Sequence, residues 1–110
     1  MANVPADVAK TLKVKKDGLK RILKDHDYAA KELEREEKRL ADFQSDASKV
    51  DRVRQQQMVV EESRKMIPEA KSRLTKAAAD LQDYLTREGL EEGEDVEQAK
   101  AFIVQAQAMN

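Results

Sequence analysis

The sequence contains no cysteine, which excludes disulfide bonds, thiolate catalysis and thiolate metal sites. Aromatic residues make up only 4% of the 110 residues. The chain has three glycines and two prolines, so few positions interrupt a helix. No apolar run approaches the roughly 20 residues that a membrane helix requires, and no apolar signal-peptide core opens the chain. We therefore expect a single-domain cytoplasmic protein with no membrane partner.

Charged residues are abundant, at 39% of the chain, yet the formal net charge is only -1. A net charge this small gives no global field that would attract nucleic acid. The charge is uneven, with a basic segment over residues 10–24 and an acidic segment over residues 88–97. Solvated helix faces explain most such segments. A basic helix that binds nucleic acid is a weaker alternative, because no aromatic residues are interleaved with its lysines.

Apolar residues at heptad spacing predict a first helix over about residues 5–44. The seven-residue series is Leu12, Leu19, His26, Leu33 and Leu40. Pro5 suits the start of this helix, because its missing N–H needs no partner in a first turn.

A second heptad series predicts a second helix over about residues 49–87. Its members are Val53, Val60, Ile67, Leu74 and Leu81, flanked by Val50, Ser63, Ala70, Ala77, Ala78, Tyr84 and Leu85. Ser48, followed three residues later by Asp51, has the form of a helix N-cap. Pro68 lies inside this helix, where the loss of one backbone hydrogen bond predicts a bend near residues 64–67 and not an end.

Glycine marks the end of the second helix, since Gly89 can adopt the left-handed conformation and let Leu90 fold back onto the last turn. A third helix is predicted over about residues 93–108 by the apolar stripe Val96, Ala99, Phe102, Ile103 and Ala106. Together these patterns predict an all-α fold. We expect one domain over residues 1–110, an elongated antiparallel three-helix bundle with coiled-coil-like packing, two long helices and a shorter C-terminal helix.

The third helix is too short to cover both long helices, because a helix rises only about 1.5 Å per residue. It is expected to cover residues 12–22 and 67–85. The far half has a poorer seam, with Glu36, Gln56 and Gln57 at seam positions. We expect that half to be either mobile or completed by a partner.

Catalytic and metal motifs are absent from the sequence. His26 is the only histidine and lies at a seam position, where a packed side chain is the simplest interpretation. The Glu-x-x-His pattern of di-metal bundles does not occur, nor does a Gly-rich phosphate loop or a GxSxG motif. We therefore predict a protein that is not an enzyme and uses no cofactor or metal.

Three collinear segments resemble the tubulin-folding cofactor A (tubulin-specific chaperone A) family over about residues 11–104. They are Thr11-Leu12-Lys13-Val14-Lys15 with Leu19-Lys20-Arg21-Ile22-Leu23-Lys24, Gln56-Gln57 with Glu62-Ser63-Arg64-Lys65-Met66-Ile67-Pro68 and Asp80-Leu81-Gln82, and Leu90-Glu91-Glu92 with Ala99-Lys100-Ala101. The run from Glu62 to Pro68 is the most specific, because it contains a proline in a helix interior.

This resemblance implies a cytoplasmic, cytoskeleton-associated chaperone with an elongated three-helix fold. It implies that the protein holds folding-competent β-tubulin after release from the chaperonin, and passes it on for assembly of the α/β-tubulin heterodimer. Other tubulin-folding cofactors would be indirect partners, and binding would use helix faces instead of a pocket. The chain departs from the family in residues 1–10, in the connection over residues 44–49 and at Gly93.

Two groups of residues are candidates for contact with an acidic β-tubulin. The partner-binding candidates are Lys13, Lys16, Lys20, Arg21 and Lys24, followed by Glu62, Arg64, Lys65 and Met66. Ile67 and Pro68 are expected to serve the structure, Ile67 in the core and Pro68 at the bend.

The alternative function is a charged structural coiled coil or scaffold that self-associates. We expect a monomer or a weak homodimer.

Overall fold

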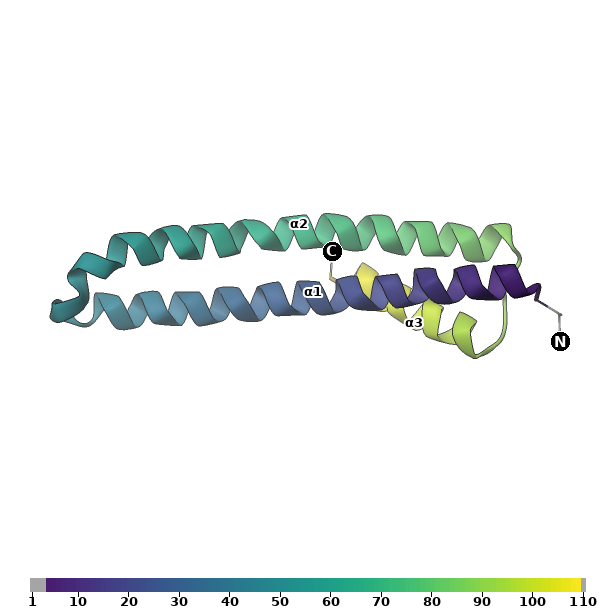
Figure 1. Cartoon of the computed structure of the whole chain (residues 1–110), viewed down its shortest axis with the longest axis horizontal. Helices are drawn as coiled ribbons and strands as arrows, with labels where there is room; N and C mark the ends of the chain where they lie inside the picture. Colours follow the sequence, from purple (N-terminus) through teal and green to yellow (C-terminus); the bar gives the residue numbers. More distant parts are fainter. Residues whose placement is uncertain (1–3, 110) are drawn as a thin grey trace. The chain divides into compact units, whose positions relative to one another are not determined.

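A computed structural model describes residues 4–109. This part of the chain contains α1 (Ala6–Gln44), a 3-10 helix η1 (Ala47–Arg52), α2 (Val53–Arg87) and α3 (Glu94–Ala108), and it has no strand (Figure 1). The prediction of an all-α fold with three helices is confirmed.

The chain divides into two compact units, residues 4–24 with 71–109 (the three-helix unit) and residues 25–70 (the two-helix unit). That both units form one domain remains a prediction.

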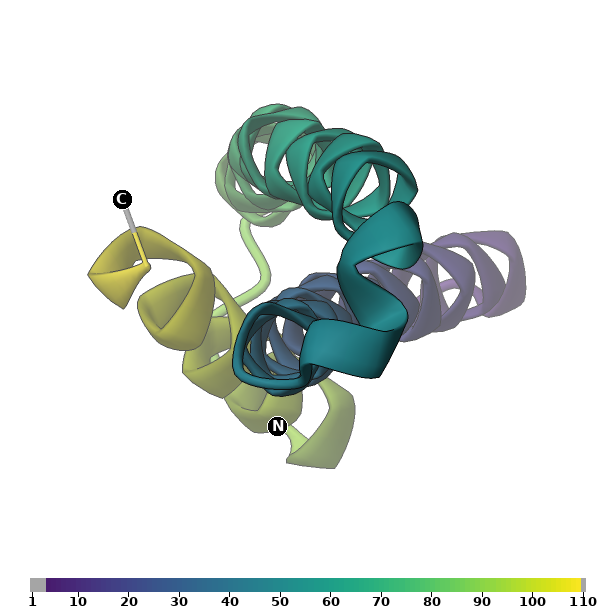
Figure 2. The ribbon, with the colours of Figure 1, turned by 90° about the vertical axis from the view of Figure 1, so that its left-hand side faces the viewer.

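The three-helix unit has one continuous apolar core. In it, α3 lies beside the first part of α1 and the last part of α2 (Figures 1 and 2). The core residues are Leu12, Leu19 and Leu23 of α1, Leu74, Ala78, Leu81, Tyr84 and Leu85 of α2, and Val96, Ala99, Ile103 and Ala106 of α3. All of these residues except Leu23 come from the predicted heptad, flanking and stripe positions, because apolar side chains three and four apart share a helix face.

The end of α2 follows the predicted glycine geometry. Gly89 has a φ of 63°, and its N–H donates to the Thr86 carbonyl at 3.2 Å. The Leu90 N–H donates to the Leu85 carbonyl at 2.9 Å, which completes a Schellman motif. Leu90 packs partly buried against the core, as expected. The chain is thereby turned back toward α3.

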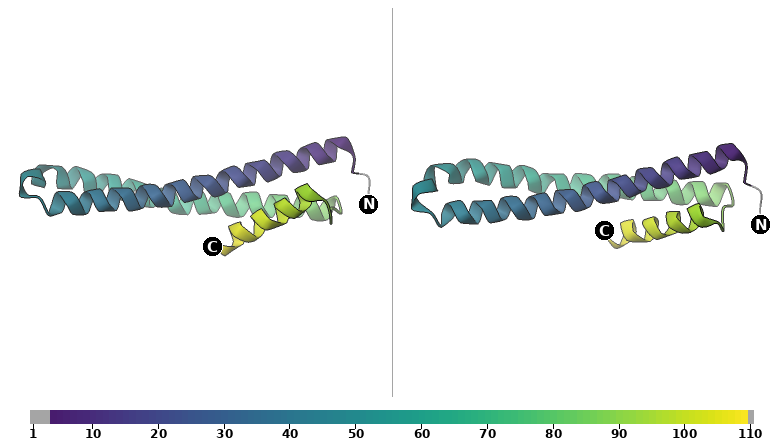
Figure 3. Two further views of the ribbon diagram at one scale, coloured as in Figure 1. Left: turned by 90° about the horizontal axis from the view of Figure 1, so that it is seen from below. Right: turned by 60° about the horizontal axis from the view of Figure 1, so that its bottom comes forward.

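The two-helix unit contains the second part of α1 and the first part of α2. They run side by side in opposite directions and are joined through η1 (Figure 3). The buried residues of this unit are Gln56, Val60, Ser63 and Ala70, so only half of them are apolar. Gln56 Nε2 donates to the Glu36 carbonyl at 3.0 Å and to the Glu36 carboxylate at 2.6 Å. The seam of this unit therefore includes a polar contact.

The connection between α1 and α2 differs from the prediction in two ways. The cap is Asp46, whose carboxylate accepts hydrogen bonds from the N–H and the hydroxyl of Ser48, so Ser48 is a donor here and not the N-cap. Residues 47–52 form the 3-10 helix, and α2 begins at Val53 instead of residue 49. Val50 is 72% exposed, so its assignment to the seam is wrong. Gln57 is also exposed, and Gln56 takes the seam position beside it.

Candidate partner-binding surface

A basic face lies on α1 in the three-helix unit. Lys13, Lys20, Arg21 and Lys24 are all exposed, at spacings that keep them on neighbouring turns of the helix. Within residues 4–109, no salt bridge engages any of these four side chains. We name these four residues the basic face. Its charge is directed to solvent and is open to an anionic partner.

Lys16 lies apart from the basic face, although the sequence placed it there. Its side chain is 7% exposed, and its Nζ lies 2.7 Å from Asp95 Oδ1 and 2.6 Å from Gln98 Oε1. Both acceptors lie at the start of α3, so Lys16 links α1 to α3 in the core of the unit. We therefore remove Lys16 from the candidate surface. Its spacing from Leu12 and Leu19, at i+4 and i−3, is the sequence signal for an inward position.

Lys15 is likewise engaged within the three-helix unit. Its Nζ lies 2.7 Å from Asp80 Oδ2 and 5.4 Å from the centre of the Tyr84 ring. The Tyr84 hydroxyl donates to the Val8 carbonyl at 3.4 Å. The two neighbouring lysines, Lys15 and Lys16, thus hold α1 to α2 and α3, whereas the basic face has no such contacts.

The second candidate group lies on α2 in the two-helix unit, and all four of its side chains are exposed. Arg64 approaches Glu37 of α1 at 3.5 Å, and Lys65 approaches Glu62 at 4.0 Å. Pairs this exposed contribute at most about 1 kcal/mol, so they restrain these side chains only weakly. Met66 is 52% exposed. The group therefore presents charge of both signs beside an apolar side chain.

Ile67 and Pro68, the two residues expected to be structural, differ in burial. Ile67 is half-buried, which suits a side chain at the edge of the seam. Pro68 is exposed, and α2 continues through it without ending, as expected. Its ring leaves the Arg64 carbonyl without the usual i+4 donor. The bend expected near this position remains a prediction.

An apolar groove lies beside Met66, and the sequence reasoning missed it. The groove has a volume of about 510 Å³ and is lined by Gln55, Met58, Val59, Glu62, Ser63 and Met66. Met58 is 62% exposed and Val59 is 37% exposed. The signal in the sequence was the spacing of three and four residues that joins Gln55, Val59, Glu62 and Met66 on one helix face away from the heptad seam.

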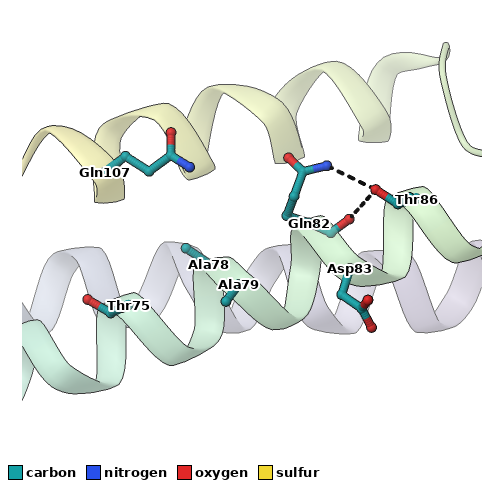
Figure 4. A pocket seen from close by; sticks show the side chains of 7 residues that line it. All are labelled: Thr75, Ala78, Ala79, Gln82, Asp83, Thr86 and Gln107. Atoms are coloured by element: carbon teal, nitrogen blue, oxygen red, sulfur yellow. Dashed lines mark hydrogen bonds between the residues drawn. The ribbon is translucent and has the colours of Figure 1, made fainter.

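A second groove lies in the three-helix unit, between α2 and the C-terminal part of α3 (Figure 4). Its volume is about 520 Å³, and it is lined by Thr75, Ala78, Ala79, Gln82, Asp83, Thr86 and Gln107. Gln82 Nε2 donates to the Thr86 hydroxyl at 3.3 Å, and that hydroxyl donates to the Gln82 carbonyl at 3.0 Å. Gln82 and Thr86 therefore already bond to each other within α2.

Other features of the described residues give no chemical site. His26 is half-buried at its seam position, and its Nε2 atom is buried without a hydrogen-bond partner. No group of three His, Asp or Glu side chains within residues 4–109 is arranged to hold a metal ion. No helix in the same range is both long and apolar enough to cross a membrane.

Three helices with exposed charged faces are typical of a helical protein that binds a partner through its surface. Comparison with known proteins gives the family. Residues 7–103 match the family described as Tubulin binding cofactor A. The chain belongs to this family, whose curated members are named as cofactors and chaperones. Neither term describes a class of enzyme.

Two curated relatives illustrate the similarity. The chain is 36% identical over 97 residues to Tubulin-folding cofactor A of Arabidopsis thaliana, an alignment that covers 86% of each protein. It is 30% identical over 93 residues to Tubulin-specific chaperone A of Oryctolagus cuniculus, which covers 84% of this chain and 86% of the relative.

Two solved structures share the fold. The crystal structure of recombinant tubulin-binding cofactor A from Leishmania major has a TM-score of 0.85 and 38% identity, over 96% of this chain and 98% of that one. Tubulin folding cofactor A from Arabidopsis thaliana also gives a TM-score of 0.85, with 34% identity over 94% of this chain and 99% of its own.

Proposed function

We propose that the chain is a tubulin-folding cofactor that holds folding-competent β-tubulin after its release from the chaperonin. It passes β-tubulin on for assembly of the α/β heterodimer, acts in the cytoplasm and meets other tubulin-folding cofactors only indirectly. The observation that carries this proposal is the family match over residues 7–103. The names of the relatives, Tubulin-folding cofactor A and Tubulin-specific chaperone A, support tubulin as the client.

The basic face is proposed to steer the client. Lys13, Lys20, Arg21 and Lys24 are exposed and free of salt bridges to residues 4–109, so binding does not first have to break a contact within the chain. The resemblance implies an acidic β-tubulin, and opposite charge accelerates association more than it raises affinity. The basic face should therefore act mainly on the association rate.

The second group is proposed as the anchor. An exposed apolar side chain that becomes fully desolvated contributes more to affinity than a charge at the rim of an interface. Met66 provides such a side chain, with Glu62, Arg64 and Lys65 around it. A moderately polar surface of this kind suits a chaperone that must also release its client.

Charge reversal tests the steering role. The triple variant Lys13→Glu, Lys20→Glu, Lys24→Glu should capture β-tubulin about tenfold more slowly at low salt. The matched control is Lys38→Glu, Lys71→Glu, Lys76→Glu, which changes the net charge equally at other exposed lysines. Association rates with purified β-tubulin, measured between 20 and about 300 mM salt, should converge for the two variants as screening increases. Equal rates at low salt would remove the basic face from the proposal.

Capture itself tests the function. The folded wild-type chain, immobilised in cytosol, should retain β-tubulin identified by immunoblot, and it should retain less α-tubulin. If the folded chain retains no tubulin, the proposed function is wrong whatever the behaviour of the basic face.

A further inference from the structure

We propose that the groove face of α2, defined by Gln55, Met58, Val59, Glu62, Lys65 and Met66, is a contact between two copies of this chain packed antiparallel. The face lies entirely within the two-helix unit, in the first half of α2. This inference goes beyond the proposed function, because it concerns a second copy and not the client.

The apolar exposure of this face requires a reason. Met58 is 62% exposed, Met66 is 52% exposed and Val59 is 37% exposed, and all three line one groove of about 510 Å³. Single exposed apolar residues are ordinary, but several gathered in one groove indicate a contact surface. Methionine side chains are flexible and pack against many shapes, which suits a contact that must also separate.

The order of side chains on the face is self-complementary. Met58 lies four residues before Glu62, and Met66 lies four residues after it. When a second α2 packs antiparallel about a two-fold axis near Glu62, Met58 of each copy meets Met66 of the other. A two-fold contact of this kind uses the same patch twice and closes, so it gives a dimer and not a filament.

The charges on the face point to the same occupant. Glu62 and Lys65 carry opposite charges within one helical turn, and Lys65 Nζ lies 4.0 Å from Glu62 Oε1. In the antiparallel pair, each Glu62 also comes within reach of Lys65 on the second copy, which offsets the repulsion between the two glutamates at the axis. The basic face on α1 carries one sign of charge in its four members and would repel a second copy of itself. Charge complementarity therefore selects the groove face for self-association.

The length of the face sets the strength of the dimer. Residues 55–66 span about 18 Å of helix, so the contact is smaller than the roughly 800 Å² per partner of a stable interface. We expect a dissociation constant on the order of 100 µM. Since Glu62, Lys65 and Met66 also belong to the proposed client anchor, a bound client would displace the second copy.

Sedimentation equilibrium over about 10 µM to 1 mM tests the dimer. The wild-type chain should shift from monomer to dimer across this range, and Met58→Asp should weaken the dimer by about tenfold. The matched control is Val14→Asp on α1, because Val14 is 65% exposed and lies outside the groove. A wild-type chain that stays monomeric at 1 mM, or an equal loss in both variants, would overturn the proposal.

A charge exchange tests the pairing without touching the apolar residues. Glu62→Lys and Lys65→Glu should each weaken self-association, because each makes the face carry one sign of charge. Mixing the two variants should produce a heterodimer tighter than either homodimer, with each variant first confirmed as folded by circular dichroism. If the mixture associates no better than its components, the two copies do not pair through these charges.

Single cysteines test the orientation, since the chain has none of its own. Glu62→Cys, at the two-fold axis, should form a disulfide dimer rapidly under mild oxidation. Gln55→Cys should not, because the antiparallel arrangement holds its two copies about 21 Å apart along the helix. Rapid crosslinking of Gln55→Cys with none at Glu62→Cys would overturn the antiparallel arrangement.

Discussion

The two units of the chain are built from the same two long helices, yet they close their seams differently. In the three-helix unit α3 completes an apolar core, in which Leu19 and Leu81 are fully buried. In the two-helix unit no third helix is present, and Gln56 and Ser63 are buried beside Val60 and Ala70. The comparison teaches that a heptad seam gives a dry core only where a third element removes it from water. At the two-helix seam, Gln56 keeps hydrogen-bond partners on Glu36, whereas the Nε2 atom of His26 is buried without one.

The largest expected effect comes from truncating one buried apolar side chain in each unit. Leu81→Ala should lower the free energy of unfolding by about 3 kcal/mol, because it leaves a cavity in a closed core. Val60→Ala in the two-helix unit should cost about 1.5 kcal/mol, because it removes less apolar volume than a leucine truncation. Urea denaturation followed by circular dichroism measures both. Equal losses would break the distinction between the two seams.

A smaller effect is expected from making the seam of the two-helix unit apolar. Gln56→Leu should raise the stability of residues 25–70 by about 1 kcal/mol, because Glu36 is partly exposed and can regain water when it loses its partner. Hydrogen exchange of amides in this unit measures the gain. The control is Gln57→Leu, whose side chain is exposed and should change protection little. A gain at Gln57 equal to that at Gln56 would contradict the observed seam.

The smallest effect concerns acid sensitivity at the connection in the two-helix unit. The hydroxyl of Ser48 donates to Asp46 and, with the Ser48 N–H and Lys49, lowers the pKa of that carboxyl below its ordinary value of 3.8. A lowered pKa means that the ionised cap stabilises η1 above about pH 3.8, and that this contribution is lost as the pH falls through the lower folded value. Titration by NMR should therefore show Ser48→Ala raising the pKa of Asp46 toward 3.8. In Asp46→Asn the acid-dependent shifts of the η1 amides should disappear, and their persistence would assign them to another group.

The heptad pattern predicted the three helices and most of the core, because burial repeats with the helix period. Leu12, Leu74 and Leu81 lie buried where the pattern placed them. The pattern could not distinguish a closed seam from an open one, so it treated Leu33 and Leu40 as equal to Leu19, although both are only half-buried.

The candidate surface was less predictable than the fold. Lys16 was grouped with its basic neighbours, because its partner Asp95 lies far along the sequence and only the folded chain brings the two together. The start of α2 was placed too early, because residues 47–52 form the 3-10 helix η1 and α2 begins only at Val53. The cap was assigned to Ser48, whereas Asp46 caps η1 and Ser48 donates to it. The groove face does not follow from the heptad pattern, because Met58, Val59 and Met66 lie off the seam positions that this pattern defines.

The ion pair between the buried Lys16 and the partly exposed Asp95 also determines which turn of α3 meets α1. Apolar residues spaced along α3 fit a smooth apolar surface at several offsets, so they choose among alternatives poorly. Sliding α3 by one turn, about 5.4 Å, would take Asp95 and Gln98 away from Lys16 and strand an ammonium group in the core. Lys16 thus fixes the register of α3 against α1, because one register of α3 is far more favourable than the registers shifted by one turn.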